Sequence, residues 1–389
     1  MKIALVVNDN FTMWQFFRGL IEALVKRGFA VYLITPSGEY TERLEALGAR
    51  HIAVPMSRFI NPVNDLLTLW RLYKIFRRGA FDIVHNIQIK PTVFGAIAAR
   101  MAGAPRVAGS TAGLGYPFFI ENPGLFHRSL AWLILHLMRL GSRLSDKIWF
   151  QNGDDLDFFV TRGVVPSAKA VLIRSNGVNV EEYSAQAVDQ SKVVSLRGEL
   201  DLNDSDPIVT MVVARLIWSK GVKEFLEAAA IMKSRRPDVQ FLLIGARDDG
   251  HPDSVPESYL RDKTNGKCRV ITTFRTDIRE ILWMSDIVVL PSYFREGIPR
   301  VLIEALSLSK PIVTTDNPGC REVVDRGENG FLVPVRNSKA LADGIARLIE
   351  DDVLRRRFGQ HSRRKAEAEF DERIVVHTIL TQLYELRSY

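Results

Sequence analysis

The chain alternates short apolar runs with longer helical patterns, and this alternation occurs twice along its 389 residues. Strands of a parallel sheet are buried on both faces, so they appear in a sequence as nearly unbroken apolar runs. Helices between such strands cover the two faces of the sheet. The alternation therefore predicts an α/β fold made of two doubly wound parallel sheets. Strands are expected at Ile3–Val7, Ala30–Ile34, His51–Val54, Ile83–His85, Arg106–Gly109 and Lys147–Gln151, and again at Pro207–Val213, Val239–Ile244, Val270–Thr273, Ile287–Leu290, Pro311–Thr315 and Gly330–Val335.

The division into domains is indicated by a polar stretch in the middle of the chain. Residues from about 180 to 205 lack a core pattern, so we place the junction there. The expected domains are residues 1–185 and 186–370, followed by a C-terminal helix over 371–389 that packs back on the first domain. A chain of this length exceeds what one hydrophobic core usually organises. The cleft between two such domains is the expected place for a ligand.

A pair of carboxylates marks the joint between an expected strand and an expected helix. Glu296 lies in the loop after Ile287–Leu290, and Glu304 lies about one turn into a helix expected from Val301 to Leu308. Pro299 fits the first turn of that helix, where a proline costs no hydrogen bond. The helix N-terminus presents unpaired N–H groups that suit a phosphate, and the two carboxylates suit sugar hydroxyls. The alternative is an ordinary joint with two solvated glutamates.

Two basic residues follow the first strand of the second domain. Arg215 and Lys220 leave the carboxyl edge of the sheet together, where open α/β sheets bind ligands. A guanidinium and an ammonium at one place suit a diphosphate and would stabilise charge on a departing nucleotide. A solvated loop pair is the alternative reading.

Together these motifs resemble those of retaining glycosyltransferases of family 4. The resemblance rests on the stretches ARLIWSKGVKEF, REGIPRVLIEA and DNPGCREVV in the second half, and on DIVH, IKPTVFG and TAGLGYPF in the first half. It covers essentially the whole chain and implies the GT-B fold, with two Rossmann-like domains and a cleft between them. Within the family, the chain is most similar to bacterial enzymes that extend sugars on undecaprenyl diphosphate, N-acetylgalactosaminyltransferases among them.

The resemblance assigns roles to individual residues of this sequence. It implies that Glu296 contacts the donor sugar, that Arg215 and Lys220 bind the donor diphosphate, and that Glu304 holds the ribose. The further donor-side residues that it implies are Gly245, Phe274, Arg275, Gly297, Ile298, Arg300 and Val301. On the acceptor side it leaves His85 and Lys90 as candidates. His85 at the end of a buried strand is equally well read as a core histidine, and Lys90 as a solvent-facing lysine.

The mechanism that the resemblance implies retains the anomeric configuration and uses no metal or other cofactor. The implied reaction moves a hexose or N-acetylhexosamine from a UDP-sugar to a polyprenyl-diphosphate-linked sugar. Asp154-Asp155 and Asp248-Asp249 are read as solvated turns and not as metal ligands. One alternative with the same fold is an epimerase or hydrolase of UDP-sugars. A non-enzymatic membrane or nucleic-acid binding module is a second alternative.

The charge of the chain is concentrated in its first half. Residues 1–180 contain 21 Lys and Arg against 12 Asp and Glu, whereas the remainder contains 31 against 33. A basic half indicates an anionic partner. The segments Leu66–Arg78 and Leu125–Leu140 combine Trp, Phe and Leu with Arg and Lys in a helical period, which favours a membrane surface over nucleic acid. Core helices with a basic outer face are the alternative.

The expected location is the cytoplasm, on the inner face of the cytoplasmic membrane. The apolar run between Arg128 and Arg139 is too short to span a bilayer. The two cysteines, Cys268 and Cys320, form no metal or disulfide pattern, which fits a reducing compartment.

Overall fold

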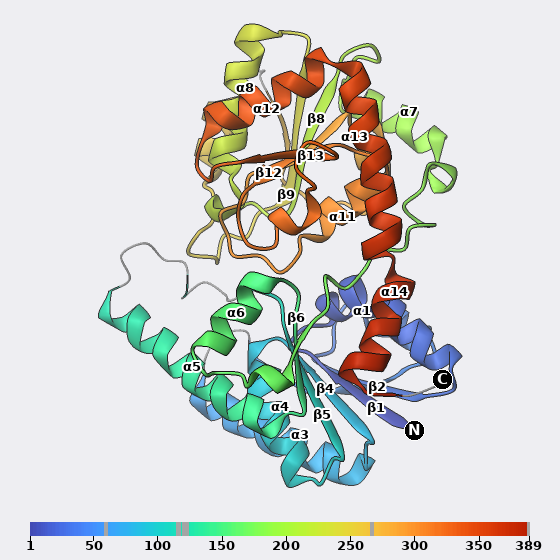
Figure 1. The fold of residues 1–389 in the computed structure, drawn as a ribbon, viewed down its shortest axis with the longest axis vertical. Helices are drawn as coiled ribbons and strands as arrows, with labels where there is room; N and C mark the ends of the chain where they lie inside the picture. The colour runs from blue at the N-terminus through green and yellow to red at the C-terminus, as the bar shows by residue number, and fades with distance from the viewer. Residues whose placement is uncertain (58–60, 114–117, 119–123, 265–267, 387–389) are drawn as a thin grey trace. The chain divides into compact units, whose positions relative to one another are not determined.

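The computed structural model describes residues 1–57, 61–113, 118, 124–264 and 268–386. The chain folds into two compact units (Figure 1). The first comprises Met1–Gly177 together with the C-terminal residues from Glu372, and the second comprises Val178–Asp371. The junction therefore lies at Gly177 and not at residue 185, and the chain returns to the first unit at Glu372.

The first unit is built on a seven-stranded sheet in the order β3-β2-β1-β4-β5-β6-β7, in which neighbouring strands are parallel. Its strands are β1 Lys2–Val6, β2 Ala30–Thr35, β3 Arg50–Ala53, β4 Ile83–Ile87, β5 Arg106–Thr111, β6 Lys147–Phe150 and β7 Ala170–Leu172. The central strands are buried along their length, which explains their unbroken apolar sequences.

Helices cover both faces of this sheet. They are α1 Asn10–Lys26, α2 Thr41–Glu45, α3 Pro62–Gly79, α4 Ile89–Met101, α5 Leu125–Leu144, α6 Gly153–Thr161, the 3₁₀ turn η2 Ser167–Lys169, α14 Glu372–Thr378 and the π-helical turn η7 Ile379–Leu383. Figure 1 shows α3, α4 and α5 over one face and α1 with α14 over the other. Asx capping sets several helix starts: the carboxylate of Asp9 accepts the Thr12 N–H at 2.6 Å, and the amide of Asn61 caps α3.

The second unit contains a six-stranded parallel sheet in the order β10-β9-β8-β11-β12-β13. Its strands are β8 Ile208–Arg215, β9 Gln240–Ala246, β10 Arg269–Ile271, β11 Ile287–Leu290, β12 Ile312–Thr315 and β13 Gly330–Val333. Its helical elements are η3 Ala185–Ala187, α7 Gln190–Glu199, η4 Trp218–Lys220, α8 Val222–Arg235, α9 Glu257–Thr264, α10 Ile278–Met284, α11 Arg300–Ser307, η5 Arg321–Val323, α12 Ser338–Glu350, α13 Asp352–Lys365 and the π-helical η6 Ala366–Phe370.

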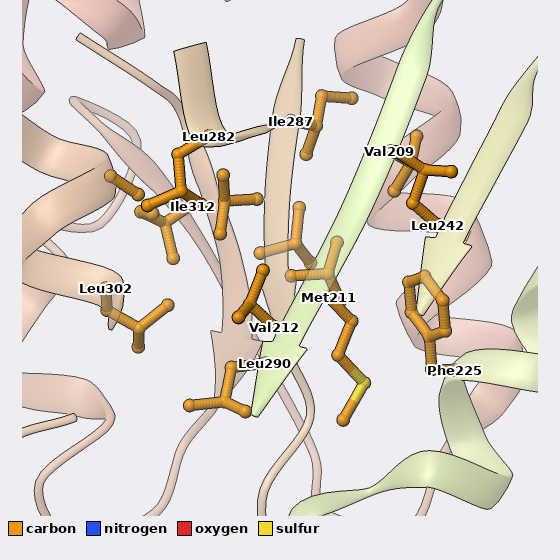
Figure 2. Packing of buried hydrophobic residues seen from close by; sticks show 14 of the residues in the cluster. Val209, Met211, Val212, Phe225, Leu242, Leu282, Ile287, Leu290, Leu302 and Ile312 are labelled. Carbon is orange, nitrogen blue, oxygen red and sulfur yellow. The ribbon is translucent and has the colours of Figure 1, made fainter. Parts of the chain in front are cut away.

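One continuous hydrophobic core fixes this sheet and its helices. Figure 2 shows Met211 and Val212 of β8 between Leu302 of α11 on one side and Phe225 of α8 on the other. Each of these side chains is at most 7% exposed. Because β8, β11 and β12 are neighbours, the loops that follow their carboxyl ends lie next to one another.

The structure departs from the sequence expectation in the polar stretch after residue 180. That stretch is not a linker without a core pattern, because α7 lies within it and buries Val193 and Leu196. Val193 and Leu196 are three positions apart and are the buried residues of a ten-residue helix, so the pattern was too sparse to detect. Pro299 also differs slightly, since it is the N-cap residue of α11 and precedes its first turn.

Within the described residues, no helix is long and apolar enough to cross a membrane.

Candidate functional site

Lys220 and Glu296, 76 residues apart, meet in the second unit. The ammonium of Lys220 in η4 donates to Oε1 of Glu296 in the loop after β11. The same carboxylate oxygen accepts a hydrogen bond from the hydroxyl of Ser292 at 2.9 Å. Glu296 is 9% exposed, and the side chain of Lys220 is 18% exposed. These two predicted site residues, one from each motif, therefore lie together in one nearly buried place at the carboxyl edge of the sheet.

Two glycines allow the three loops of this site to approach closely. Gly221 follows Lys220 with φ +83°, and a Cβ there would overlap the carbonyl oxygen of Pro291 at the start of the Glu296 loop. Gly319, after β12, has φ +80°, and a Cβ there would overlap the carbonyl oxygen of Gly297. Both positions need a residue without a Cβ for conformational and steric reasons. The loop that holds Glu296 is thus fixed from both neighbouring strands.

Side chains from β12 and its loop hold the backbone of the same loop. The amide of Asn317 donates to the carbonyl of Phe294 at 2.6 Å, and the hydroxyl of Thr315 donates to the carbonyl of Ser292. The side chain of Ile298 is 7% exposed and belongs to the hydrophobic core. Ile298 therefore anchors the loop, and what it offers a ligand is its backbone.

The second glutamate of the motif lies in a buried network on α11. Arg300 donates through Nε to Oε1 of Glu304 at 2.7 Å, one helical turn away. Burial raises the pKa of Glu304, and the Arg300 guanidinium and a hydrogen bond with Tyr183 act in the opposite direction. Burial also raises the pKa of Tyr183 well above its ordinary value, so its hydroxyl stays protonated. Glu304 is 4% exposed and has partners from two directions.

Arg215 and Arg275, two more predicted residues, bind carboxylates of the chain. Arg215 at the end of β8 lies 3.3 Å from Asp248, which follows β9. Arg275, after β10, pairs with Glu199 of α7 and with Asp277 at 2.6 Å each. The hydrogen bonds to these two carboxylates raise the pKa of Arg275.

Gly245 and Phe274 complete the donor-side set. A Cβ at Gly245 would lie 2.8 Å from the carbonyl oxygen of Val213, so close packing of β9 on β8 already explains this glycine. Phe274 is 57% exposed. Val301 lies in the first turn of α11, after Gly297 and Arg300.

The two acceptor-side candidates lie in the first unit in very different surroundings. His85 on β4 is fully buried; its Nδ1 lies 2.8 Å from the hydroxyl of Tyr384 and its Nε2 lies 3.1 Å from that of Ser110. Burial lowers its pKa to about 3. This is the core-histidine alternative, and His85 has no surface to offer an acceptor.

Lys90, at the start of α4, is also held by its own unit and is not the solvent-facing lysine of the alternative reading. Its ammonium lies 2.7 Å from Asp65 of α3 and 2.9 Å from the carbonyl of Ser57. The side chain is 14% exposed. Part of the TAGLGYPF motif, residues 114–117, lies outside the described residues.

The acidic pairs lie where proteins place capping and ion-pairing residues. Asp154 and Asp155 are in the first turn of α6 and not in a loop, with Asp155 2% exposed beside Asn152. Asp248 pairs with Arg215, and Asp249 pairs with Arg247 at 2.8 Å. Among the residues that the structure describes, no group of three or more His, Cys, Asp or Glu is arranged to hold a metal ion.

Ser292, Tyr183 and Asp248 are contacts that the sequence interpretation missed or read differently. Ser292 lies two residues after the end of the buried strand β11, which is a detectable signal for a site residue. Tyr183 is separated from Glu304 by 121 residues and has no such signal.

Both halves of the chain match models of glycosyltransferase families. A model for glycosyl transferases group 1 matches residues 196–365, and a model described as glycosyl transferase 4-like matches residues 2–152. The N,N'-diacetylbacillosaminyl-diphospho-undecaprenol alpha-1,3-N-acetylgalactosaminyltransferase of Campylobacter jejuni is 31% identical over 386 residues, covering 99% of this chain and 98% of its own. The UDP-Gal:alpha-D-GlcNAc-diphosphoundecaprenol alpha-1,3-galactosyltransferase of Escherichia coli is 27% identical and covers 86% of this chain and 83% of its own.

Solved structures agree on the fold. The Anabaena protein HepE in complex with UDP and glucose superposes with a TM-score of 0.81 at 20% identity, over 99% of this chain and 100% of the other. The glycosyltransferase WaaG, involved in lipopolysaccharide biosynthesis, has a TM-score of 0.76 at 14% identity, over 98% and 99%. With two parallel doubly wound sheets, a full-length relative above 30% identity and matching models over both halves, the chain belongs to glycosyltransferase family 4 and has the GT-B fold.

Proposed function

We propose that this glycosyltransferase moves a hexose or N-acetylhexosamine from a UDP-sugar to a polyprenyl-diphosphate-linked sugar, with retention of anomeric configuration, during assembly of a bacterial surface glycan. The contact between Lys220 and Glu296 carries the proposal, because it unites a diphosphate-binding cation with a sugar-binding carboxylate. The names of the Campylobacter and Escherichia coli relatives, which act on sugars linked to diphospho-undecaprenol, support the acceptor.

The residues of the second unit suggest how the donor is held. Glu296 and Ser292 present oxygen atoms to sugar hydroxyls, and the ammonium of Lys220 lies beside them. The carboxylate of Glu296 pairs with the ammonium of Lys220. When the donor binds, we propose that Lys220 and Arg215 turn toward the diphosphate and leave Glu296 for the sugar. Their positive charges then stabilise the negative charge that grows on the departing UDP.

The proposed transfer needs no nucleophile of the enzyme. The acceptor hydroxyl oxygen forms a bond to the anomeric carbon as the bond from that carbon to the UDP oxygen breaks. The proton of the acceptor hydroxyl passes to the β-phosphate oxygen of the leaving UDP. The products are a glycoside of unchanged configuration and UDP, so every atom of the substrates is accounted for.

We also propose that the reaction is metal-independent. In support, Asp248 and Asp249 are each paired with an arginine, and Asp154 and Asp155 lie in the first turn of α6. We expect the rate of transfer in excess EDTA to equal the rate measured with added Mg²⁺. A loss of turnover in EDTA that Mg²⁺ or Mn²⁺ restores would contradict a metal-independent reaction.

We further propose that the chain works on the inner face of the cytoplasmic membrane, where its lipid-linked acceptor would be embedded.

The decisive experiment replaces the carboxylate without changing its shape. Glu296→Gln is expected to lower kcat for transfer by roughly 10²-fold or more, because a placed charge at the reacting sugar is lost. Glu350→Gln, at the exposed end of α12, is the matched control and should leave kcat unchanged. Near-normal turnover in Glu296→Gln would contradict the proposed role.

The same assay separates the transferase from an epimerase or hydrolase. A panel of UDP-sugars is incubated with and without a synthetic polyprenyl-diphosphate-linked sugar, and UDP release is followed. Release is expected to depend on the acceptor, and NMR of the product is expected to show the donor's anomeric configuration. Equal UDP release without acceptor would favour hydrolysis.

A further inference from the structure

Helices α3, α4 and α5 are neighbours in the layer on one face of the first unit's sheet, to which α6 also contributes. Helix α4 packs against the sheet, and α3 and α5 each contact α4 (Figure 1). Together these three helices contain nine basic residues and a single acidic residue, Asp65. Asp65 is 5% exposed and is paired with Lys90, so the exposed surfaces of α3, α4 and α5 carry only positive charge.

The first two thirds of α5 is apolar without being buried. Between Leu125 and Leu137 no residue is buried, and the buried residues of this helix, Met138, Gly141 and Ser142, lie in its last two turns. Leu125, Phe126 and Trp132 are 82%, 74% and 60% exposed. A soluble helix normally turns its large apolar side chains to the core, so a run of them in water indicates a partner.

Helix α3 presents an exposed face whose character changes along its length. Val63, Leu66, Leu67 and Trp70 recur at helical spacing and are each at least 43% exposed. The same face continues with Lys74, Arg77 and Arg78, which are also exposed. The ammonium of Lys74 lies 3.4 Å from the ring centroid of Trp70, where the apolar and basic parts meet. Tryptophan beside basic residues is typical of the membrane–water interface.

We propose that the exposed faces of α3 and α5 form a docking surface for a bilayer rich in anionic lipid. The first turns of α5, with Leu125, Phe126 and Trp132, enter the boundary between headgroups and acyl chains. Arg77 and Arg78 of α3 bind the lipid phosphates, and Lys74 and Trp70 lie at the interface. This surface deepens the proposed function, because it assigns the membrane contact to named residues. Its biological purpose rests on the proposed function, but its binding to a bilayer does not.

Charge decides between a membrane and a second copy of the chain. A symmetric dimer through this face would bring the basic helices of both copies together, because the same patch lies on both sides of such an interface. Helices α3, α4 and α5 have no exposed acidic residue to pair with them. Anionic headgroups supply the missing negative charge. Each basic residue near the surface increases the affinity for the membrane about fivefold.

Vesicle flotation with the full chain tests the surface directly. Binding is expected to vesicles of phosphatidylglycerol and phosphatidylcholine, to weaken strongly in pure phosphatidylcholine, and to fall with added salt. Trp132 emission should shift to the blue and be quenched by lipids brominated on their acyl chains. Trp132→Phe should reduce both the shift and the quenching. Absence of binding to anionic vesicles at low salt would overturn the proposal.

Matched variants separate this surface from general effects of charge and exposed apolar area. Arg77→Glu/Arg78→Glu is expected to weaken binding by at least about 25-fold, from two lost cations. Its control, Lys26→Glu/Arg27→Glu, changes the charge equally at the end of α1 on the opposite face of the sheet and should bind nearly as the wild type. Leu125→Ser/Phe126→Ser should weaken binding by about 10-fold or more, since apolar insertion is lost. Its control is Val194→Ser/Val353→Ser in the second unit, where the side chains are 72% and 74% exposed.

Two further readouts make the remaining outcomes decisive. Equal losses of vesicle binding in the test and control variants would contradict the assignment of the surface. So would a wild-type protein that is dimeric without lipid and becomes monomeric in Leu125→Ser/Phe126→Ser. Transfer to a water-soluble short-chain acceptor should be unchanged in the variants, whereas transfer to an acceptor in vesicles should fall. Vesicle binding without any transferase activity would refute the proposed function and leave the docking surface standing.

Discussion

At the scale of single residues, His85 shows how strongly the first unit excludes charge. Its imidazole is fully buried, with Phe17, Trp149 and Tyr384 as ring neighbours at centroid distances of 5.6 to 6.1 Å. Its two nitrogens are already used by the hydroxyls of Tyr384 and Ser110. A proton on this ring would place an uncompensated charge in the core, which is why burial lowers the pKa.

The lowered pKa of His85 predicts a stability loss in acid. The folded group titrates at about 3 and the unfolded one at its ordinary 6.5, so the unfolded chain binds the extra proton between these values. The contribution is complete above pH 6.5 and is lost as the pH falls toward 3, at about 1.4 kcal/mol per pH unit. Urea unfolding of the first unit at pH 7.5 and 5.5 should show this loss. His85→Gln should reduce the pH dependence, whereas the exposed His377→Gln should retain it. An unchanged slope in His85→Gln would contradict the assignment.

At the scale of elements, the site depends on loops that fix one another. The Glu296 loop lies between a turn that needs Gly221 and a turn that needs Gly319. Each glycine permits a close approach of backbone that places a charged side chain, so loop geometry and charge placement are coupled.

A pair of glycine variants tests this coupling. Gly319→Ala combines strain at φ +80° with overlap on the carbonyl of Gly297, and it should lower kcat/KM for transfer about 10²-fold by moving the loop. Gly327→Ala is the control: its φ is +77°, but a Cβ there meets nothing within 4 Å. It should suffer similar backbone strain and retain activity. Steady-state kinetics and thermal melting of both variants check the prediction. Equal kinetics in the two would show that the contact with Gly297 is irrelevant.

Much of the element order was predictable because buried parallel strands are apolar runs. Ile287–Leu290 and Gly330–Val333 fall within their expected ranges. The meeting of Lys220 with Glu296 was also predictable, since both follow strands at the same edge of a sheet. The helix α7 was not, because Val193 and Leu196 alone face the core. Nor was the contact of Tyr183 with Glu304, which depends on tertiary packing and has no local pattern.

At the scale of the whole molecule, the first unit is not continuous in sequence. The first unit is completed by the segment from Glu372, whose residues Val375, Ile379, Leu380, Leu383 and Tyr384 lie in the same hydrophobic core as β1 and α1. The guanidinium of Arg106 at the start of β5 donates to the carbonyl of Tyr384, and Lys147 lies 3.7 Å from Glu385. The end of the chain is therefore a structural part of its first half.

Paired substitutions in this C-terminal segment should destabilise the first unit, most of which lies far away in the sequence. Leu380 and Leu383 are 4% and 1% exposed, and replacing each with Ala should cost roughly 2–5 kcal/mol. Differential scanning calorimetry of Leu380→Ala/Leu383→Ala should show a much lower transition for the first unit and an unchanged one for the second. The control Thr381→Ala/Gln382→Ala alters exposed neighbours and should shift neither. A lowered transition for the second unit instead would refute the assignment.

The return of the chain at Glu372 also sets the order in which the protein is made. A ribosome finishes the whole second unit before it adds the residues that cover α1 and the buried ring of Trp149. Until then the nascent first half exposes an apolar face, and it is a natural client for chaperones. A messenger RNA truncated near its 3′ end would therefore yield a protein that lacks C-terminal residues. Its unfolded half would nevertheless be the N-terminal one.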